Sequence, residues 1–428
     1  MSRTQEVLLK TLFFSSSGME LDIQSEIGLL TRVVVHTPGN EVSMVNPDDR
    51  ETMLFDDIVY EEDAREEHLD MLKVFQAVMG PEGEIHEILN LLKDSFEVEG
   101  SLEAFKKGLL PFTTMEDAHS WISWLDELPL EETIRLSLDG HHPALKHSCF
   151  APIPNLLFTR DLASVSRSTM VLSSMSKDAR RRESYIMRHI SKWHPYFGAL
   201  QKDLVYLNDD NLVEGGDILT VSDRVVLIGL SERTSISGVM QVAQELLQRG
   251  IETVLAIDIP KRRSSMHLDT IFTFVSQDEC VAYSPVIEHK ASQVIGFQMD
   301  GQKLCSKTYG SLIEALKAAT GTSYRIIPCG GEDPINQSRE QWTDGANLFA
   351  LAPGVVLGYA RNQHTFAALE KAGYKTMTQE ECVEQTIRDG GQLHLGSDKL
   401  AISFQGHELC RGRGGARCMT MPLTRKPV

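Results

Sequence analysis

The sequence predicts an α/β fold built from a repeated unit, because four segments of the chain share one layout. Each segment has an Asp, an apolar strand, a short polar or glycine-containing turn and a second apolar strand, which is the pattern of a β-hairpin. With 428 residues, of which 42% are hydrophobic and 24% charged, the chain suits two globular domains or one large repeated architecture.

The hairpins follow one another along the chain, each with an Asp just before its first strand. Repetition about an axis would bring these carboxylates together at one end. A fifth, degenerate copy is expected at residues 28–39, where the strand RVVVHT ends in a Pro-Gly turn. The four clear copies are RDLASVSRSTMVLSS from Arg160, GDILTVSDRVVLIG from Gly216, LDTIFTFVSQDECVAYS from Leu268 and TDGANLFALAPGVVLGY from Thr343, with Asp161, Asp217, Asp269 and Asp344.

A helix and a further strand follow the second hairpin, which makes the repeat a hairpin–helix–strand unit. The segment ETVLAIDI predicts the strand, and the helix is expected to end near Gly250. Residues from about 88 to 149 show helical periodicity and no convincing strand pair, which predicts an inserted helical bundle. The apolar residues that recur at three- and four-residue steps in the first helix are Ile236, Val239, Met240, Ala243, Leu246 and Leu247.

The charge and the cysteines exclude several classes of protein. A formal net charge of −18 disfavours nucleic acid as a partner and favours a small cationic ligand. The seven cysteines are scattered and form no CxxC pair, which argues against a disulfide framework or a structural zinc site and favours a reducing, cytoplasmic location. No apolar run approaches the ~18 residues of a membrane span, and residues 1–19 are expected to form a loose N-terminal extension.

Three short motifs and one cysteine carry the candidate chemistry. The motifs are FTRD at 158–161, EGGD at 214–217 and MHLD at 266–269, and the cysteine is Cys418 near the C-terminus. Taken alone, each residue has an ordinary structural explanation, such as a turn cap or core packing. Their equivalent places in the repeat favour one shared pocket.

Two kinds of site fit these residue types. Cysteine, histidine and carboxylate can all bind a metal, but the motifs contain one His and no HxxxH or CxxC spacing, so we expect no metal. A cysteine nucleophile with His267 as acid and base fits better. The carboxylates of Asp161, Glu214 and Asp269 then suit a bound guanidinium, because its planar donor fork pairs with two carboxylates.

The nucleophile requires a thiolate, whereas a free thiol with a pKa of about 8.5 is only a few per cent ionised at neutral pH. We expect nearby positive charge, from His267, Arg417 or the bound guanidinium, to lower the pKa of Cys418, although the acids oppose this effect. Arg413 in the same glycine-rich loop is either a surface cation or a receptor for a carboxylate.

Ten motifs in order along the chain carry a resemblance: SEIGLLTRVVVHTPG, LFDDIVY, PNLLFTRD, ARRRE, EGGD, VVLIGLSERTS, MHLDT, REQW, GVVLGYARN and GRGGARCMTMPL. Together they resemble the arginine deiminases of the guanidine-modifying, or pentein, superfamily over nearly the whole chain. The resemblance implies a five-bladed, pseudo-fivefold α/β propeller of ββαβ units with an inserted helical bundle. The implied domains are a first part of the propeller at 1–87, the helical insertion at 88–149 and the rest of the propeller at 150–428.

The resemblance also implies a role for each site residue. Cys418 would attack the guanidinium carbon of L-arginine, and His267 would protonate the departing ammonia and activate the water that releases L-citrulline. Asp161 and Asp269 would clamp the guanidinium nitrogens, while Glu214 would complete the network. The resemblance implies that the enzyme needs no cofactor and forms a homo-oligomer. The residues implied to bind the rest of the substrate are Asn155, Phe158, Arg180, Arg233, Arg413 and Leu54.

Two alternatives remain open on the sequence. An amidinotransferase or another guanidine-modifying enzyme would use the same cysteine intermediate, with an amine as the acceptor in the first case. A non-catalytic binding or moonlighting protein would keep the pocket without turnover.

Overall fold

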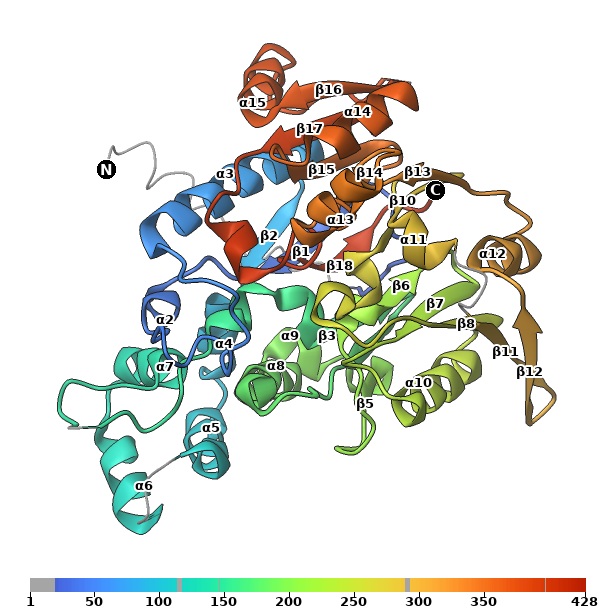
Figure 1. Ribbon diagram of the computed structural model, residues 1–428. Helices are drawn as coiled ribbons and strands as arrows, with labels where there is room; N and C mark the ends of the chain where they lie inside the picture. The colour runs from blue at the N-terminus through green and yellow to red at the C-terminus, as the bar shows by residue number, and fades with distance from the viewer. Residues whose placement is uncertain (1–19, 114–117, 146, 289–292, 397) are drawn as a thin grey trace.

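The computed structural model describes residues 20–113, 118–145, 147–288, 293–396 and 398–428, so the predicted N-terminal extension lies outside the described residues. The described strands form five separate sheets flanked by helices, and the predicted α/β class is confirmed (Figure 1). No helix in the described part of the chain is long and apolar enough to cross a membrane.

One strand arrangement recurs in all five sheets. An antiparallel pair is extended by a strand that runs parallel to the second member of the pair. The four predicted hairpins form the antiparallel pairs of four sheets, so these predictions are confirmed. Their strands are β3 (Ala163–Ser166) with β4 (Thr169–Leu172), β6 (Ile218–Thr220) with β7 (Val225–Leu230), β9 (Phe272–Phe274) with β10 (Glu279–Ala282), and β14 (Phe349–Ala352) with β15 (Val355–Tyr359).

The remaining strands of these four sheets come from later in the chain. One strand lies parallel to the second strand of each hairpin, and two of the sheets are extended further. The parallel strands are β5 (Leu204–Tyr206), β8 (Thr253–Asp258), β13 (Arg325–Pro328) and β17 (Lys399–Phe404), and the extending strands are β11 (Val294–Asp300), β12 (Lys303–Tyr309) and β16 (Tyr374–Thr378).

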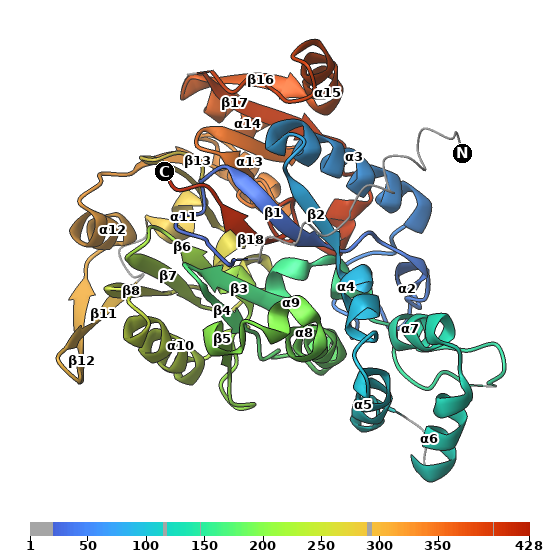
Figure 2. The same ribbon diagram turned by 180° about the vertical axis from the view of Figure 1, so that it is seen from behind.

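The fifth sheet joins the two ends of the chain. β1 (Leu30–Val35), predicted from RVVVHT, pairs antiparallel with β18 (Met421–Arg425) and parallel with β2 (Glu84–Glu87). The partner of the degenerate fifth copy is therefore the last strand of the chain, and Figure 2 shows the two strands side by side. Because β18 begins three residues after Cys418, its pairing with β1 fixes the position of the Cys418 backbone.

Helices occupy the connections between the strands. The predicted helix after β7 is α10 (Ile236–Gln248), and it buries Val239, Ala243 and Leu246. Ile236 and Met240, predicted for the same face, are 54% and 36% exposed because the buried face is centred on the other positions. The other helices outside 88–139 are α2 (Asn40–Ser43), α3 (Glu61–Met79), α8 (Arg181–Trp193), α9 (Pro195–Gly198), α11 (Ser284–Ile287), α12 (Leu312–Thr320), α13 (Pro334–Trp342), α14 (Gln363–Lys371) and α15 (Gln379–Arg388).

The helical stretch that follows β2 projects from one side of the sheets, at the lower left of Figure 1. Buried Phe105 and Trp121 of this stretch share a hydrophobic core with Val165 of β3 and Ile186 of α8. The stretch is therefore packed against the sheet of β3, β4 and β5. Its helices are α4 (Ile88–Ser95), α5 (Ser101–Gly108), α6 (Ala118–Glu127) and α7 (Leu130–Asp139).

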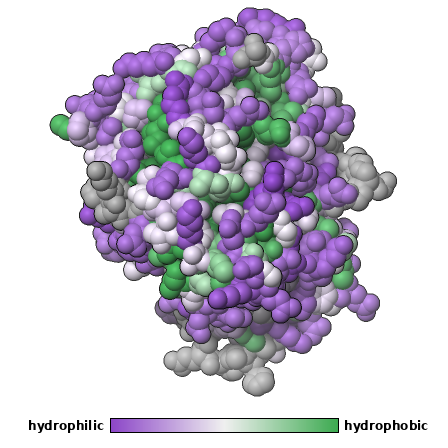
Figure 3. All heavy atoms as spheres, turned by 90° about the vertical axis from the view of Figure 1, so that its right-hand side faces the viewer, coloured by the Kyte–Doolittle hydropathy of each residue, from purple (hydrophilic) through white to green (hydrophobic). Residues whose placement is uncertain are grey.

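The edge strand β12 lies on the side of the molecule that carries α12. Its Lys303 and Lys307 place positive charge along the edge, which discourages pairing with a strand of another molecule. Figure 3 looks at this side and shows a largely hydrophilic surface with small, separate hydrophobic patches.

Candidate active site

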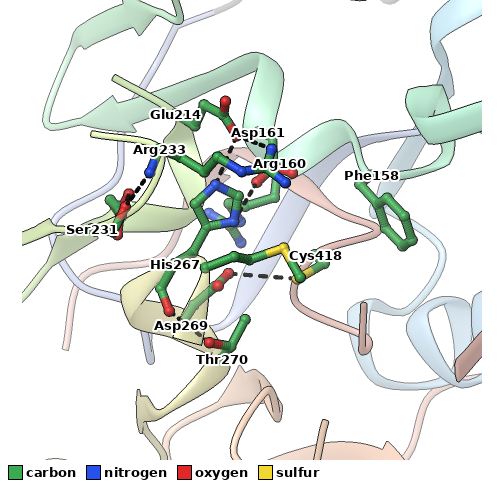
Figure 4. Close-up of polar contacts among 12 residues, drawn as sticks. Phe158, Arg160, Asp161, Glu214, Ser231, Arg233, His267, Asp269, Thr270 and Cys418 are labelled. Atoms are coloured by element: carbon green, nitrogen blue, oxygen red, sulfur yellow. Dashed lines mark hydrogen bonds and ion pairs between the residues drawn. The ribbon is translucent and has the colours of Figure 1, made fainter. Parts of the chain in front are cut away.

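Three short 3₁₀ turns bring the predicted site residues together. Each turn comes directly before the first strand of a hairpin, and the turns pack against one another. As a result Asp161, Glu214, His267 and Asp269 meet in one buried cluster (Figure 4). The convergence predicted from the repeat is present. The turns are η3 (Thr159–Leu162), η6 (Gly215–Asp217) and η8 (Leu268–Thr270).

Asp217, the equivalent acid of the second hairpin, accepts hydrogen bonds from other residues of the protein. Its carboxylate accepts hydrogen bonds from Ser231 Oγ at 2.5 Å, Thr234 Oγ1 at 2.6 Å and the backbone N–H of Leu268 at 2.8 Å. These bonds tie η6 to η8 and leave the carboxylate with its hydrogen-bonding capacity largely taken up.

His267 is held between two of the acids. Its Nε2 lies 2.8 Å from Glu214 Oε2 and its Nδ1 lies 3.5 Å from Asp161 Oδ1. Burial would lower the pKa of His267, but the carboxylates of Asp161, Glu214 and Asp217 outweigh it and raise the pKa to about 9. The imidazole is therefore protonated at neutral pH and can act as an acid.

Replacing Glu214 with Gln is expected to lower the pKa of His267 by ~1 to 3 units, since an adjacent charge is lost. The imidazolium stabilises the fold below pH 6.5, and this contribution is lost as pH rises through about 9. The His267 ring signal in an NMR titration measures the shift. Glu232→Gln removes a nearby acid that does not contact the imidazole, and an equal shift in that variant would contradict the assignment.

Two of the predicted substrate-binding arginines already contact the acids. Arg180 Nη1 lies 2.5 Å from Asp161 Oδ2, and its Nε lies 2.8 Å from Glu183 Oε2. Arg233 Nη1 lies 3.4 Å from Glu214 Oε2. Burial would raise the pKa of Glu214, but Arg233, His267 and Arg180 lower it well below its usual value.

Cys418 lies at the edge of the same cluster and is 4% exposed. Its Sγ is 3.8 Å from Asp269 Oδ2, so the thiol and one predicted clamp residue do meet. Burial raises the pKa of the thiol well above its usual value, and the charges of Asp269, Asp161 and Asp344 raise it further, with only Arg417 among the main neighbours opposing. The expectation of a lowered thiol pKa is wrong for this arrangement, because burial, followed by the charges of the three acids, outweighs the opposing charge of Arg417.

Arg417 fixes one side of Asp269. Its Nη1 lies 2.7 Å from Asp269 Oδ2, while its Nε and Nη2 lie 3.2 and 3.0 Å from Glu26 Oε2. Asp269 Oδ1 has no hydrogen-bond partner in the described part of the chain, and neither has Asp161 Oδ1. Each of these buried carboxylates therefore keeps one oxygen that accepts no hydrogen bond, although Asp161 Oδ1 lies 3.5 Å from His267 Nδ1.

Arg413 is buried near the thiol and lacks a hydrogen-bonded partner. Its guanidinium carbon lies 3.6 Å from the centre of the Trp342 ring, and among the described residues none hydrogen-bonds to its three side-chain nitrogens. A carboxylate oxygen of Asp56 lies 4.0 Å from its Nε. A Cβ at the next residue, Gly414, would lie 2.3 Å from the Phe158 ring, so glycine allows the loop to approach closely.

The remaining predicted pocket residues lie around Arg180. Asn155 Nδ2 donates to the carbonyl oxygen of Met53 at 2.7 Å, and the Asn155 carbonyl accepts from Arg180 Nη2 at 3.1 Å. Phe158 is buried beside the loop of Cys418. Leu54 has a left-handed backbone (φ +63°) in the segment that Asn155 contacts.

Two residues were missed as site candidates although their hairpin was found. Asp344 is 2% exposed, has no hydrogen-bond partner for its carboxylate within the described residues, and has a pKa raised to about 7 by burial despite the opposing charge of Arg413. Asn347 bonds to the Cys418 backbone. Asp344 could have been found from its equivalent position in the repeat. No signal in the sequence pointed to Asn347.

Asp161, Glu214 and His267 offer ligand atoms within 4.8 Å of one another, a spacing that can hold a metal ion. The guanidinium groups of Arg180 and Arg233 contact Asp161 and Glu214, and their positive charge opposes binding of a metal ion between these two carboxylates.

Five sheets that repeat one strand arrangement and a buried cluster of a cysteine, a histidine and carboxylates define an α/β protein with a candidate cysteine-dependent active site. A family model described as arginine deiminase matches residues 126–425. The chain is 33% identical to an arginine deiminase of Listeria innocua over 432 residues and 33% identical to one of Bacillus cereus over 439 residues, covering 95% of this chain and 98% and 99% of those relatives. The chain belongs to the arginine deiminase family.

One solved structure shares the fold at low sequence similarity. An amidinotransferase of saxitoxin biosynthesis from Microseira wollei superposes with a TM-score of 0.53 at 13% identity, covering 95% of this chain and 98% of that chain.

Proposed function

We propose that this protein hydrolyses the guanidinium group of free L-arginine to give L-citrulline and ammonia through a covalent intermediate on Cys418. The observation that carries the proposal is the pair of free oxygens, Asp161 Oδ1 and Asp269 Oδ1, buried in the cluster that the Cys418 thiol touches. A guanidinium donates hydrogen bonds to carboxylates in its own plane, which suits two carboxylate oxygens that accept no hydrogen bond from the protein.

Binding of the cation prepares the nucleophile. Asp161 and Asp269 raise the pKa of the Cys418 thiol, so a guanidinium between them offsets that effect and favours the thiolate. The thiol proton passes to water, and Sγ forms a bond to the guanidinium carbon. His267, which is protonated at neutral pH, gives its proton to the departing nitrogen as the C–N bond breaks and ammonia leaves.

Hydrolysis of the thiouronium group returns the protein to its starting state. The neutral His267 takes a proton from water while the water oxygen bonds to the substrate carbon. The remaining hydroxyl proton passes to Sγ as the C–S bond breaks, which releases citrulline and restores the Cys418 thiol and the protonated His267. Glu214, whose Oε2 lies 2.8 Å from His267 Nε2, orients the ring and stabilises its charged form.

The amino-acid end of arginine requires a receptor for its carboxylate. Arg413 is the best suited, because its three side-chain nitrogens have no hydrogen-bond partner in the described part of the chain. Arg180 and Arg233 were predicted for the same role, but in this structure they hold Asp161 and Glu214 at the guanidinium end of the pocket. Asn155, Phe158 and Leu54 line the pocket in this proposal. Agmatine lacks the carboxylate, so arginine is the favoured substrate.

We expect the purified protein to form equal amounts of citrulline and ammonia from arginine with no amine acceptor present. The assay compares arginine with agmatine at equal concentration, and kcat/KM is expected to be at least ~100-fold higher for arginine, because agmatine cannot make the charge-assisted contact to Arg413. Methylated arginine keeps that carboxylate, so it tests the guanidinium end of the site separately. Turnover that requires an added amine would instead indicate an amidinotransferase. Tight binding of arginine without any product would indicate a binding protein.

The architecture around the site is part of the proposal. Five sheets that repeat one strand arrangement support a five-bladed, pseudo-fivefold propeller of ββαβ units, with 1–87 and 150–428 in the propeller and 88–149 as the helical insertion. Seven cysteines without a disulfide support a reducing, cytoplasmic location. We also propose a homo-oligomer, which light scattering of the purified protein would measure.

A further inference from the structure

We propose that Asn347 is a positioning residue for the reaction, which holds the nucleophilic Cys418 in register with the clamp residue Asp269. This inference rests on the proposed function of the same site. It concerns a side chain that touches neither the reacting sulfur nor the two free carboxylate oxygens.

Both polar atoms of the Asn347 side chain are used, and each is bonded to a different part of the site. Oδ1 accepts a hydrogen bond from the backbone N–H of Cys418 at 3.0 Å, and Nδ2 donates to the backbone carbonyl of Asp269 at 2.9 Å. Asn347 is 1% exposed, so water does not compete for these bonds. One amide group thus joins two backbone segments that lie 149 residues apart.

The backbone of the nucleophile is held on its other side as well. The Cys418 carbonyl accepts from the backbone N–H of Arg160 at 3.0 Å. The loop before the cysteine reaches Asn347 closely, because a Cβ at Gly415 would lie 2.8 Å from the Asn347 carbonyl oxygen and 2.9 Å from its Oδ1. Glycine at 415 therefore permits the contact on which the Asn347 bond depends.

The chemistry explains why this connection matters. Sγ must reach the carbon of a guanidinium whose place is set by Asp269, so the distance between the two residues decides the approach of sulfur to carbon. A displacement of 1 Å in such an arrangement costs about 100-fold in rate. An amide supplies one acceptor and one donor at fixed spacing, which neither a carboxylate nor an apolar side chain can do.

The matched control is Asn362, which supports the same turn from outside the site. It is also fully buried, and its amide bonds to the backbone and side chain of Thr343, at 2.9 and 2.6 Å. Both of these side-chain hydrogen bonds go to Thr343, and neither goes to Cys418 or Asp269. We expect Asn347→Ala to lower kcat by about 100-fold with KM changed less than about threefold, and Asn362→Ala to leave kcat within about threefold of the parent.

Asn347→Asp provides a second variant of nearly unchanged shape. It keeps an acceptor for the Cys418 N–H but loses the donor to Asp269 and adds a negative charge, so kcat is expected to fall by at least about 30-fold and its pH dependence to move to higher pH. If Asn347→Ala does not fold, the kcat of Asn347→Asp tests the inference instead. Unfolding curves confirm that the compared proteins are native.

The result that overturns the inference is a kcat for both Asn347 variants equal to that of Asn362→Ala within about threefold. This result differs from a failure of the proposed function. In that case the parent protein itself would form no citrulline, whereas here the parent and the Asn347 variants would all turn over arginine.

Discussion

Cys418→Ala is expected to lower citrulline formation from arginine by at least about 10⁴-fold, because no other group can form the bond to the guanidinium carbon. The substitution removes one buried sulfur atom, so the free energy of unfolding should change by only about 1 kcal/mol. Citrulline measured under saturating arginine tests the first expectation, and a denaturant titration of the same sample tests the second.

Cys410→Ala is the matched control for this experiment. Cys410 is 6% exposed in the same C-terminal segment, and its sulfur accepts a hydrogen bond from Arg361 Nη1 at 2.5 Å. Its kcat should stay within about threefold of the parent. Citrulline formation by Cys418→Ala at the rate of Cys410→Ala would show that another residue is the nucleophile.

Arg417→Met is expected to destabilise the protein by ~3 to 5 kcal/mol, the cost of removing one partner from a buried ion pair. Arg417 is 1% exposed and bridges Glu26 and Asp269, so its loss removes the cation that pairs directly with both buried carboxylates. Unfolding in urea at pH 7 measures the change. Arg411→Met removes a partly exposed arginine from the same loop and should cost at most ~1 kcal/mol.

The pH dependence of this destabilisation follows from Glu26. Burial would raise its pKa, but Arg417, Arg160 and Arg425 lower it, so ionised Glu26 stabilises the fold above its usual pKa and this contribution is lost as pH falls. The difference between the parent and Arg417→Met should therefore shrink below about pH 4. Equal losses for Arg417→Met and Arg411→Met at neutral pH would contradict the buried-pair explanation.

The hairpins and the helix could be predicted from the sequence, because each is specified by residues close to one another in the chain. The hairpin starting near Arg160 and the one starting near Thr343 are specified by alternating apolar strands around short turns, and the helix before Gly250 by its apolar period. The exposed positions Ile236 and Met240 were not readable, since periodicity finds an apolar stripe but not which part of it meets a sheet.

The candidate site could be predicted only in part, because the sequence does not show which of its acids are occupied by hydrogen bonds. Asp161, Asp217 and Asp269 look equivalent in the repeat, yet hydroxyl groups and a backbone N–H occupy Asp217 while the other two keep a free oxygen. Hydrogen-bond satisfaction depends on groups brought in from other turns, so identical motifs acquired different uses. The thiol pKa was misjudged for the same reason, because the balance of buried charges around Cys418 is a property of the assembled cluster.

The sequence by itself determined the repeated strand pairs, the helical stretch after residue 88 and the residue types of a cysteine, histidine and carboxylate site, since these depend on local propensity and composition. Tertiary structure alone decided that the last strand closes the first sheet, that Arg417 holds Asp269, and that Asn347 joins Asp269 to Cys418. Each of these contacts links segments far apart in the chain, and only the burial and hydrogen bonding of the packed molecule select such partners.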